Sequence, residues 1–569
     1  MYSNKQNVNI LTALLISHGV RHAIVCPGSR NAPIVHNLNE CPDIHCYPVT
    51  DERSAGFYAL GMAQALNAPV AVCVTSGTAL LNLMPAVAEA YYQHQPLIVI
   101  SADRPQEWID QLDGQTLPQP GALGRFVRKT VSLPENDSWY CRRLVNEALL
   151  DAMADDARPV HINVPITEPL FTFDVPELPA VRQFVRTSPT RNYDCLHTEF
   201  VEGLIAAQRP MIVFGQTNPY DFEGIDVDFL FSHVIVLHES LSNFPHVSHF
   251  DEVLYHGQME PPDFIIHVGN TTVSKRLRHF LRSAKDAVTW RISQSGDVED
   301  TFQNLRGIIV GDPESVLQSL DQKISHRRLN GMGYRRQWLT ALTEASQHAN
   351  DYQPAYSQMA AVKCFEEKLS SIHHPLPTIH NSPSTIHHPL STIHHPLPTI
   401  HYANSTAIRL ANIYAAHYVW CNRGVNGIEG SLSTAAGFSV VSDEKVFCVI
   451  GDLSFFYDQN ALWNQNLRGN FRILLLNNGR GGIFNLLPGL DKSPARDPFV
   501  AAEHHTTAEG ICRQDNVTYL MATNMEELQQ GIDTLLYIES DRPVLLEVTT
   551  DANEDERVFR DYYEKQKQG

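Results

Sequence analysis

Short apolar runs alternate with amphipathic segments of helical length through most of this chain, which is typical of α/β folds built on parallel sheets. The clearest unit predicts a strand at Val70–Val74, a helix at Gly77–Tyr92 and a second strand at Leu97–Ser101. Two further blocks repeat the rhythm, with strands expected at Met211–Phe214, Val234–Leu237, Phe264–Val268 and Gly307–Val310, and then at Tyr418–Cys421, Val446–Ile450, Ile473–Leu476 and Val544–Val548. The predicted fold class is therefore α/β, with doubly wound parallel sheets.

The length of the chain, 569 residues, is too great for one hydrophobic core and predicts about three or four domains. A Pro-containing polar stretch at residues 173–192 separates the first two blocks and suits a linker. A second break falls around residues 327–353. We therefore expect three doubly wound domains, at residues 1–175, 194–340 and 354–569.

Residues 372–401 do not fit the pattern, because they repeat the phrase IHHPLPTIH in variants that contain eight histidines. Their prolines exclude a continuous helix. A metal-binding tract is one interpretation, and a tandem expansion of a single connecting loop is the other. We favour the expansion, because the entropic cost of closing a loop grows slowly with its length.

Charge and hydropathy exclude two classes of partner. The formal net charge of −20 argues against nucleic acid, because phosphate binding requires a basic surface. The longest apolar runs are too short to span a membrane. The apolar stretch near the start ends at Ser17 and His18 with no small-residue cleavage site, so we expect an amphipathic first helix in a cytoplasmic protein. The ten cysteines form no C-x-x-C pair and are expected to be buried free thiols.

The segment from residue 449 to residue 484 predicts a metal site. One expected strand ends in Gly451-Asp452, a helix follows, and the next strand ends in Asn477-Asn478. A carboxylate and an amide oxygen would then lie at the carboxyl ends of two parallel strands, where α/β sheets bind ligands. Mg²⁺ prefers oxygen ligands of this kind together with phosphate. The alternative is structural, with Asp452 capping a helix and the two asparagines forming a turn.

The spacing of these residues resembles the thiamine-diphosphate motif, in which Gly-Asp precedes Asn-Asn by some two dozen residues. Here 23 residues separate Leu453 from Asn477, and Leu453 departs from the Gly that is usual at its position. The resemblance implies that Mg²⁺, or Mn²⁺ in its place, binds Asp452, Asn478 and the carbonyl of Arg480. The further cofactor contacts that it implies are Leu453, Ser454 and Phe484.

Two more residues have a place in the thiamine-diphosphate pattern. Glu52, in HCYPVTDERSAGFYAL, follows an expected strand. A carboxylate there can hydrogen-bond the pyrimidine nitrogen of the cofactor and favour the tautomer that acts as an internal base. Its structural alternative is that Asp51 and Glu52 simply suit a helix N-terminus. Ile428 stands where the family has the bulky side chain beneath the cofactor, and its alternative is an ordinary core residue.

Five segments together resemble the MenD family of thiamine-diphosphate-dependent synthases: ILTALLISHGVRHAIVCPGSRNAPI, SADRP, VSKR, NSTAIR and NRGVNGIEGSLSTAAG. The resemblance covers essentially the whole chain outside the histidine repeat. It implies a transferase of menaquinone biosynthesis that decarboxylates 2-oxoglutarate and adds the resulting succinyl carbanion to isochorismate in a 1,4 sense. The first domain would bind the pyrimidine, the second would contribute substrate-binding cations, and the third would bind the diphosphate and metal.

Both of these substrates are dicarboxylates, so an acidic protein needs a local cluster of cations, and the planar fork of Arg suits carboxylates. Taken singly, each cation is more often a solvated surface charge. The substrate-binding residues that the resemblance implies are Ser29, Arg30, Gln115, Lys275, Arg276, Ser405, Arg409 and Arg423. It also implies a homodimer or homotetramer with sites at the subunit interface, where Glu52 of one chain would meet Asp452 of another.

Two other functions remain open at this point. One is a different thiamine-diphosphate carboligase or decarboxylase that resembles acetolactate synthase, although pyruvate-type substrates need fewer cations than this chain offers. The other is a non-catalytic binding protein on the same fold. The presence of Glu52, Asp452 and Asn478 argues against that second alternative.

Overall fold

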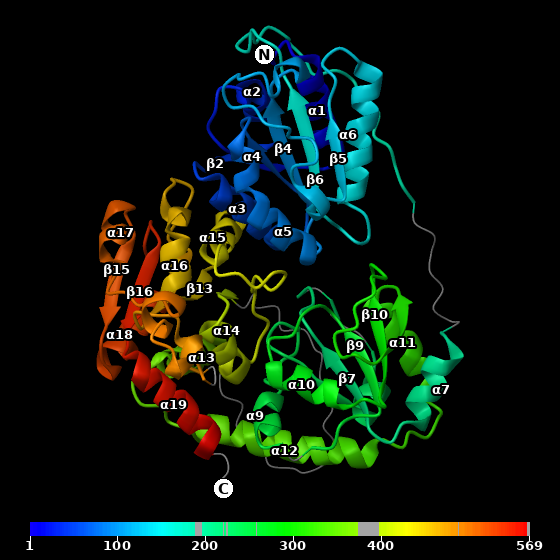
Figure 1. The fold of residues 1–569 in the computed structure, drawn as a ribbon, viewed down its shortest axis with the longest axis vertical. Coiled ribbons are helices and arrows are strands. Elements are labelled where there is room, and N and C mark those ends of the chain that lie inside the picture. Colours follow the sequence, from blue (N-terminus) through cyan, green and yellow to red (C-terminus); the bar gives the residue numbers. More distant parts are fainter. Residues whose placement is uncertain are drawn as a thin grey trace.

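The computed structural model describes residues 1–187, 196–219, 221–222, 226–257, 259–373, 398–486 and 489–565. Within these ranges the chain forms three parallel sheets of six, five and five strands, each flanked by helices (Figure 1). The α/β fold class is confirmed. The histidine repeat lies outside the described residues from residue 374 to residue 397. No described helix is long and apolar enough to cross a membrane.

The first sheet has the strand order β2-β1-β3-β4-β6-β5. Its strands are β1 (His22–Val25), β2 (His45–Pro48), β3 (Val70–Val74), β4 (Leu97–Asp103), β5 (Lys129–Ser132) and β6 (Val160–Pro165), and its helices are α1 (Gln6–Ser17), α2 (Ala32–Glu40), α3 (Glu52–Leu66), α4 (Thr78–Asn82), α5 (Met84–Tyr92) and α6 (Ser138–Ala152). The helix expected at residues 77–92 is interrupted at Leu83, because Pro85 has no N–H to donate back to α4. Residues 7–15 of α1 are all buried, so this helix is a core element and not the amphipathic helix that we expected.

The second sheet has the strand order β11-β10-β9-β7-β8. Its strands are β7 (Pro210–Phe214), β8 (Ile235–Leu237), β9 (Phe264–Val268), β10 (Val288–Ser293) and β11 (Leu305–Val310), and its helices are α7 (Thr198–Ala206), α8 (Asp228–His233), α9 (Phe250–Tyr255), α10 (Lys275–Ser283), α11 (Pro313–Ile324) and α12 (Met332–Asp351). The break expected around residues 327–353 is occupied by α12. Trp338 of this helix packs into the core beside the second sheet, and Ala349 packs into the core of the third.

The third sheet has the strand order β12-β13-β14-β16-β15. Its strands are β12 (Thr399–Tyr402), β13 (Val446–Gly451), β14 (Phe471–Asn477), β15 (Thr518–Ala522) and β16 (Val544–Thr549), and its helices are α13 (Gln358–His373), α14 (Thr406–Tyr414), α15 (Ser431–Val441), α16 (Asp452–Tyr457), α17 (Glu509–Gln514), α18 (Met525–Tyr537) and α19 (Ala552–Lys565). Short 3-10 or π turns lie at Gln106–Trp108, Gly124–Phe126, Gln459–Leu462, Gly482–Leu486, Leu490–Lys492 and Arg496–Val500.

The edge of the third sheet differs from the expected one. The prediction of a strand at Tyr418–Cys421 is wrong, because Trp420 makes only an isolated bridge to His401. The edge strand is instead β12, which consists of the last three residues of the repeat and Tyr402. Tyr402 is buried, and its hydroxyl donates to Glu366 Oε1 of α13 at 2.5 Å. The end of the repeat therefore forms a strand that the sequence analysis did not predict.

The cysteines agree with the expectation from their spacing. The nine described cysteines are free thiols. Seven of them are buried, and Cys46 and Cys364 are half-buried.

We call each sheet together with its helices a unit. Helices α3 and α15 cross in direct backbone contact and join the first unit to the third (Figure 1). A Cβ at Gly61 would lie 1.9 Å from the carbonyl oxygen of Thr434, and one at Gly437 would lie 2.2 Å from the carbonyl oxygen of Tyr58. No side chain larger than hydrogen fits at either position. The Tyr58 hydroxyl extends the contact by donating to the carbonyl of Ala461 at 2.5 Å. One continuous hydrophobic core therefore spans both units.

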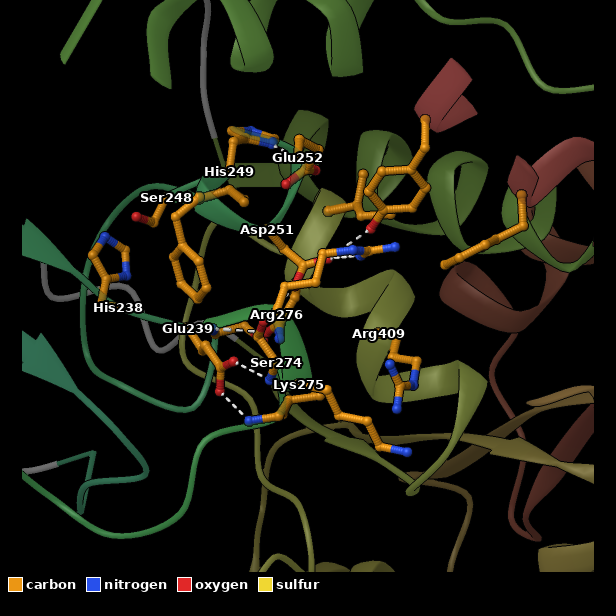
Figure 2. A pocket seen from close by; sticks show the side chains of 18 of the residues that line it. His238, Glu239, Ser248, His249, Asp251, Glu252, Ser274, Lys275, Arg276 and Arg409 are labelled. Carbon is orange, nitrogen blue, oxygen red and sulfur yellow. Dashed lines mark hydrogen bonds and ion pairs between the residues drawn. The ribbon is translucent and has the colours of Figure 1, made fainter. Parts of the chain in front are cut away.

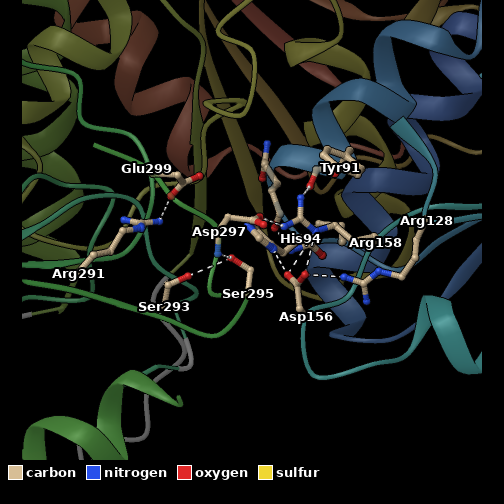
Figure 3. Close-up of polar contacts among 12 residues, drawn as sticks. Tyr91, His94, Arg128, Asp156, Arg158, Arg291, Ser293, Ser295, Asp297 and Glu299 are labelled. Atoms are coloured by element: carbon tan, nitrogen blue, oxygen red, sulfur yellow. Dashed lines mark hydrogen bonds and ion pairs between the residues drawn. The ribbon is translucent and has the colours of Figure 1, made fainter. Parts of the chain in front are cut away.

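A cluster of charged side chains joins the first unit to the second (Figure 3). The Asp156 carboxylate is hydrogen-bonded to His94 and accepts from Arg128 at 2.5 Å and from Arg158 at 3.2 Å. Arg158 also pairs with Asp297 of the second unit at 3.0 Å. Burial raises the pKa of Asp156, but the hydrogen bond from His94 and the nearby positive charges outweigh burial and lower it to about 2. The carboxylate thus stays charged at neutral pH and holds Arg158, the residue that pairs with the second unit.

The crossing of α3 and α15 predicts that Gly61→Ala destabilises the protein. Overpacking costs about 1–3 kcal/mol, which exceeds the gain of up to about 1 kcal/mol from replacing Gly by Ala in a helix. The matched control is Gly333→Ala on α12, where an added Cβ would meet no atom within 4 Å. Urea unfolding should show a lower midpoint for Gly61→Ala and an unchanged or higher one for the control. Equal midpoints in the two variants would contradict the close contact.

Candidate active site

Asp452 and Asn478 lie at the carboxyl ends of the neighbouring strands β13 and β14. Asp452 is buried at 4 % exposure. Its Oδ1 accepts from the backbone N–H of Leu453 at 2.6 Å, and its Oδ2 accepts from that of Asn478 at 3.2 Å. The carboxylate therefore ties the two strand ends together. It also occupies the N–H of Leu453, in the first turn of α16.

The amide of Asn478 is oriented by its neighbours. Its NH₂ group donates to Asp555 Oδ2 at 2.9 Å, and Thr550 donates to the same oxygen at 2.8 Å. With the NH₂ group held by Asp555, the amide oxygen is left as an acceptor, and its contact with the N–H of Arg480 is long at 3.4 Å. A carboxylate and an amide oxygen on adjacent strands form a set of hard oxygen donors that suits Mg²⁺. The residues present therefore fit the expected metal.

The turn after Asn478 requires glycine. Gly479 has a φ of +75°, and a Cβ there would lie 2.7 Å from the carbonyl oxygen of His504. The N–H of His504 donates back to the carbonyl of Gly479 at 2.7 Å. This backbone pair fixes the path of the chain into Arg480, whose carbonyl is the third expected metal ligand.

A cavity of about 280 Å³ opens at these strand ends. Its wall brings together ten residues that were singled out in the sequence: Ser405, Arg409, Arg423, Ile428, Asp452, Leu453, Ser454, Asn478, Arg480 and Phe484. Ile428 is 42 % exposed, which is unusual for a large apolar side chain and removes the ordinary-core alternative for it. The Ser454 hydroxyl donates to the carbonyl of Ile428 at 2.5 Å and so attaches that residue to α16.

Leu453, the departure from the usual motif, is accommodated by a glycine. A Cβ added at Gly481 would lie 3.3 Å from Leu453 Cδ1 and 2.8 Å from the ring of Phe484. The absence of a side chain at Gly481 therefore makes room for both of these residues on the cavity wall. The cavity therefore remains open although residue 453 is Leu and not the usual Gly.

A second cavity of about 220 Å³ adjoins the first, with Arg409 in the wall of both (Figure 2). Lys275 and Arg276 at the start of α10 line it with Arg409 of α14. Arg276 pairs with Asp251 and lies between the rings of Tyr255 and Tyr563, 4.9 Å and 4.6 Å from their centroids. The structure thus gathers three of the expected cations around one space.

The cations of this second cavity differ in whether a carboxylate is paired with them. Arg276 has Asp251 as a counter-ion, whereas Arg409 Nε is buried without a hydrogen-bond partner among the described residues. Burial lowers the pKa of Arg409, Asp251 raises it, and the like charges of Arg423 and Arg276 lower it further. Glu239, Asp251 and Glu252 line the same cavity, but Glu239 is bound to backbone N–H groups and Asp251 to Arg276. Among the described residues Arg409 therefore has no carboxylate hydrogen-bonded to it, which favours an anionic ligand.

The start of α10 is held in place by Glu239. This buried carboxylate accepts from the N–H of Val273 at 2.6 Å and from that of Ser274 at 2.8 Å (Figure 2). Burial raises the pKa of Glu239, and these two hydrogen bonds oppose the rise. Lys275 follows directly, so Glu239 fixes the point from which it projects. No motif in the sequence marks Glu239, and it was not predicted.

The four expected residues of the first unit lie in neither cavity. Ser29, Arg30, Glu52 and Gln115 follow strands of the first sheet and so lie toward its carboxyl edge. Arg30 is buried and donates to the carbonyl of Ile166 and to Glu168, both at 3.0 Å. Glu52 begins α3 and accepts from the side chain of Asn82 at 3.2 Å. One chain therefore presents two separate groups of expected site residues.

Asn404 is a further site residue that was not predicted. Its NH₂ group donates to the carbonyls of Asn422 and Gly427, both at 2.7 Å, and its oxygen accepts from Arg423 at 3.0 Å. A signal for it existed, because Asn404 opens the segment NSTAIR and immediately precedes Ser405. Ser405 itself has a φ of +71°, a strained conformation for a residue with a side chain.

Comparisons with known proteins give a consistent picture. The family description "Thiamine pyrophosphate enzyme, N-terminal TPP binding domain" matches residues 7–121, and "Thiamine pyrophosphate enzyme, C-terminal TPP binding domain" matches residues 403–548. Three relatives are named 2-succinyl-5-enolpyruvyl-6-hydroxy-3-cyclohexene-1-carboxylate synthase. Those of Bacteroides thetaiotaomicron and Bacteroides fragilis are 44% and 43% identical to this chain, with 100% of both chains covered in each case. That of Porphyromonas gingivalis is 34% identical, over 99% of this chain and 97% of its own.

Proposed function

Since the chain belongs to the family of 2-succinyl-5-enolpyruvyl-6-hydroxy-3-cyclohexene-1-carboxylate synthases, thiamine-diphosphate-dependent transferases of menaquinone biosynthesis, we propose that it decarboxylates 2-oxoglutarate and adds the succinyl unit to isochorismate. One observation carries the choice of substrates. Arg409, with no partner for its Nε, stands between the cavity of Asp452 and Asn478 and the cavity of Lys275 and Arg276. Such a charge distribution suits substrates that carry two carboxylates.

The cofactor and metal would bind in the first cavity. Asp452, Asn478 and the carbonyl of Arg480 would hold Mg²⁺, or Mn²⁺, and through it the diphosphate. The residues that would contact the cofactor itself are Ile428, Leu453, Ser454 and Phe484, which line that cavity. When bound, thiamine diphosphate supplies a carbon nucleophile and an electron sink for loss of carbon dioxide. The protein's own part is to orient the two substrates and exclude water.

The substrates would be bound through their carboxylates. Arg409 and Arg423 would each donate two N–H groups to a substrate carboxylate. Lys275 and Arg276 would bind the second carboxylate of the same substrate. Ser405 would add a hydroxyl at the cavity wall. Because Asp251 already pairs with Arg276, a substrate carboxylate must share or displace this counter-ion.

The complete site would require two chains. Glu52, Ser29, Arg30 and Gln115 lie outside both cavities of their own chain, so a homodimer or homotetramer that brings this edge over the cavities of a second copy would unite the two groups. Glu52 would then hold the proton shared between its carboxylate and the pyrimidine nitrogen of the cofactor. The domain ranges 1–175, 194–340 and 354–569, and a cytoplasmic location, belong to the same proposal.

The proposal is tested by an assay with 2-oxoglutarate and isochorismate, with and without added thiamine diphosphate and Mg²⁺. Product should form only when both are present. Carbon dioxide release from 2-oxoglutarate should far exceed release from pyruvate. Comparable release from pyruvate would favour a carboligase of the acetolactate-synthase type.

The role of Glu52 predicts that Glu52→Gln retains cofactor binding but loses most turnover, because an amide cannot stabilise the required tautomer as a carboxylate does. Calorimetry measures the binding, and the product assay measures turnover. Glu344→Gln, an exposed position on α12, is the control and should behave as wild type. Near-normal turnover of Glu52→Gln would remove Glu52 from this role.

The metal site predicts that Asp452→Ala abolishes Mg²⁺-dependent binding of thiamine diphosphate, because the metal anchors the diphosphate. Calorimetric titration of the cofactor in the presence and absence of Mg²⁺ measures this directly. Asp443→Ala, in an exposed turn before β13, provides a control for loss of one negative charge. Unchanged cofactor affinity in Asp452→Ala would show that the metal binds elsewhere.

The position of Arg409 predicts that Arg409→Ala weakens substrate binding and leaves cofactor binding intact. The loss of a charge-assisted bidentate contact should cost about 2–3 kcal/mol in apparent affinity for one substrate. Initial rates at varied 2-oxoglutarate and isochorismate identify which substrate is affected. Arg306→Ala, which removes an exposed arginine paired with Glu199, should change neither constant.

A further inference from the structure

The loop of residues 422–428 lies on the wall of the first cavity and carries two expected site residues, Arg423 and Ile428. It contains no helix or strand. Its backbone N–H and C=O groups are therefore not satisfied by a regular ladder, and those that are shielded from water need side-chain partners. Those partners decide where the loop, and with it the charge of Arg423, is placed.

Among the described residues, three side chains bond the backbone of this loop. Asn404 bonds the carbonyls near its two ends, and Ser454 bonds the carbonyl of Ile428, as described above. The third is Glu89 of α5, in the first unit. Its Oε1 accepts from the N–H of Gly424 and its Oε2 from the N–H of Val425, both at 2.7 Å. The two N–H groups directly after Arg423 are thus bound by one carboxylate.

Glu89 is built for this contact. It is only 3 % exposed, and its Oε1 also accepts from the side chain of Gln93 at 2.5 Å. Gln93 in turn accepts from Gln64 of α3 at 2.9 Å, which extends the network from α5 to α3. A Cβ added at Gly424 would lie 2.8 Å from the carbonyl oxygen of Glu89 and 3.1 Å from its Oε1, so only glycine allows the approach.

Arg423 itself has only neutral partners in its hydrogen bonds. It donates to Asn404 at 3.0 Å and to the carbonyl of Thr272 in the second unit at 3.3 Å, while its Nε is buried without a partner among the described residues. These contacts direct the guanidinium but do not neutralise it. Because the backbone of the two following residues is held by Glu89, a shift of that backbone would move the guanidinium relative to the cavity.

We propose that Glu89 is a positioning residue that holds the loop of residues 422–428 and thereby fixes where Arg423 presents its charge to a substrate carboxylate. This inference rests on the substrate role proposed for Arg423. Glu89 touches neither cavity, so its effect on the reaction is transmitted through the loop. The first unit of a chain would then shape the substrate site of its own chain, independently of the edge that it offers to a second copy.

The contact is tested by hydrogen exchange in the full chain without added cofactor. In Glu89→Gln the amide oxygen can accept from only one of the two N–H groups, and its NH₂ group faces the other. Exchange in a peptide that spans residues 422–428 should become about tenfold faster or more, while peptides from β13 and β14 keep their protection. Unchanged exchange in the loop would overturn the proposal.

The effect on the reaction is tested by a double-mutant cycle. Glu89→Gln should lower kcat/KM by about tenfold or more in the wild-type background. In an Arg423→Ala background the same change should lower it by less than twofold, because the charge that Glu89 positions is already absent. An equal factor in both backgrounds would show that Glu89 acts only on general stability and would overturn the proposal.

Two further variants keep these tests decisive. Asp321→Asn removes another buried carboxylate that accepts from a backbone N–H, that of Leu230 at 2.6 Å, and it should leave kcat/KM unchanged. Gly424→Ala displaces the loop from the other side and should reproduce the loss if Glu89→Gln does not fold. Absence of product from the wild-type protein would refute the proposed function, whereas the exchange experiment tests the loop without any substrate.

Discussion

The backbone contact between α3 and α15 is the constraint on which the rest of the structure depends. Because Gly61 and Gly437 carry no side chain, the two helices approach until carbonyl oxygens occupy the space of the missing Cβ atoms. Helix α3 begins at Glu52, and α15 follows the loop that carries Arg423. One contact therefore sets the distance between the edge of the first sheet and the cavity of the third. A looser crossing would change that distance.

The site concentrates positive charge in a protein whose net charge is −20. The partners of the cations explain how this charge remains available. Arg423 is directed by the neutral oxygens of Asn404 and Thr272, and Arg409 Nε has no partner among the described residues. Full neutralisation by carboxylates would leave little attraction for an anion, whereas unpartnered burial is costly. For Arg423, neutral acceptors hold the guanidinium in place without cancelling its charge.

The sequence revealed those parts of the fold that are coded locally. Strand β13 is a continuous apolar run and was predicted. Asp452 and Asn478 each come directly after a predicted strand, and because the carboxyl ends of parallel strands lie at one edge, their proximity could be predicted as well. Strand β10 was missed, since Thr289 and Arg291 interrupt its apolar pattern.

The residues that support the site were harder to foresee. Glu89 lies 335 residues from Gly424 in the chain, and hydropathy carries no record of such a pairing. The split of the expected site residues into two groups likewise depends on tertiary packing.

The sequence of strand β12 is not unique in the chain, because the repeat contains the same tripeptide several times. The tripeptide Thr-Ile-His of this strand also begins at residues 378, 385 and 392, always seven residues apart. The sequence thus contains four copies of the tripeptide that pairs with β13, and backbone hydrogen bonding alone does not distinguish identical tripeptides. Only the last copy is followed by tyrosine, and Tyr402 is buried against Glu366. The burial of this one aromatic side chain therefore distinguishes the copy that forms β12 from three identical tripeptides earlier in the sequence, and so sets which residues pair with β13.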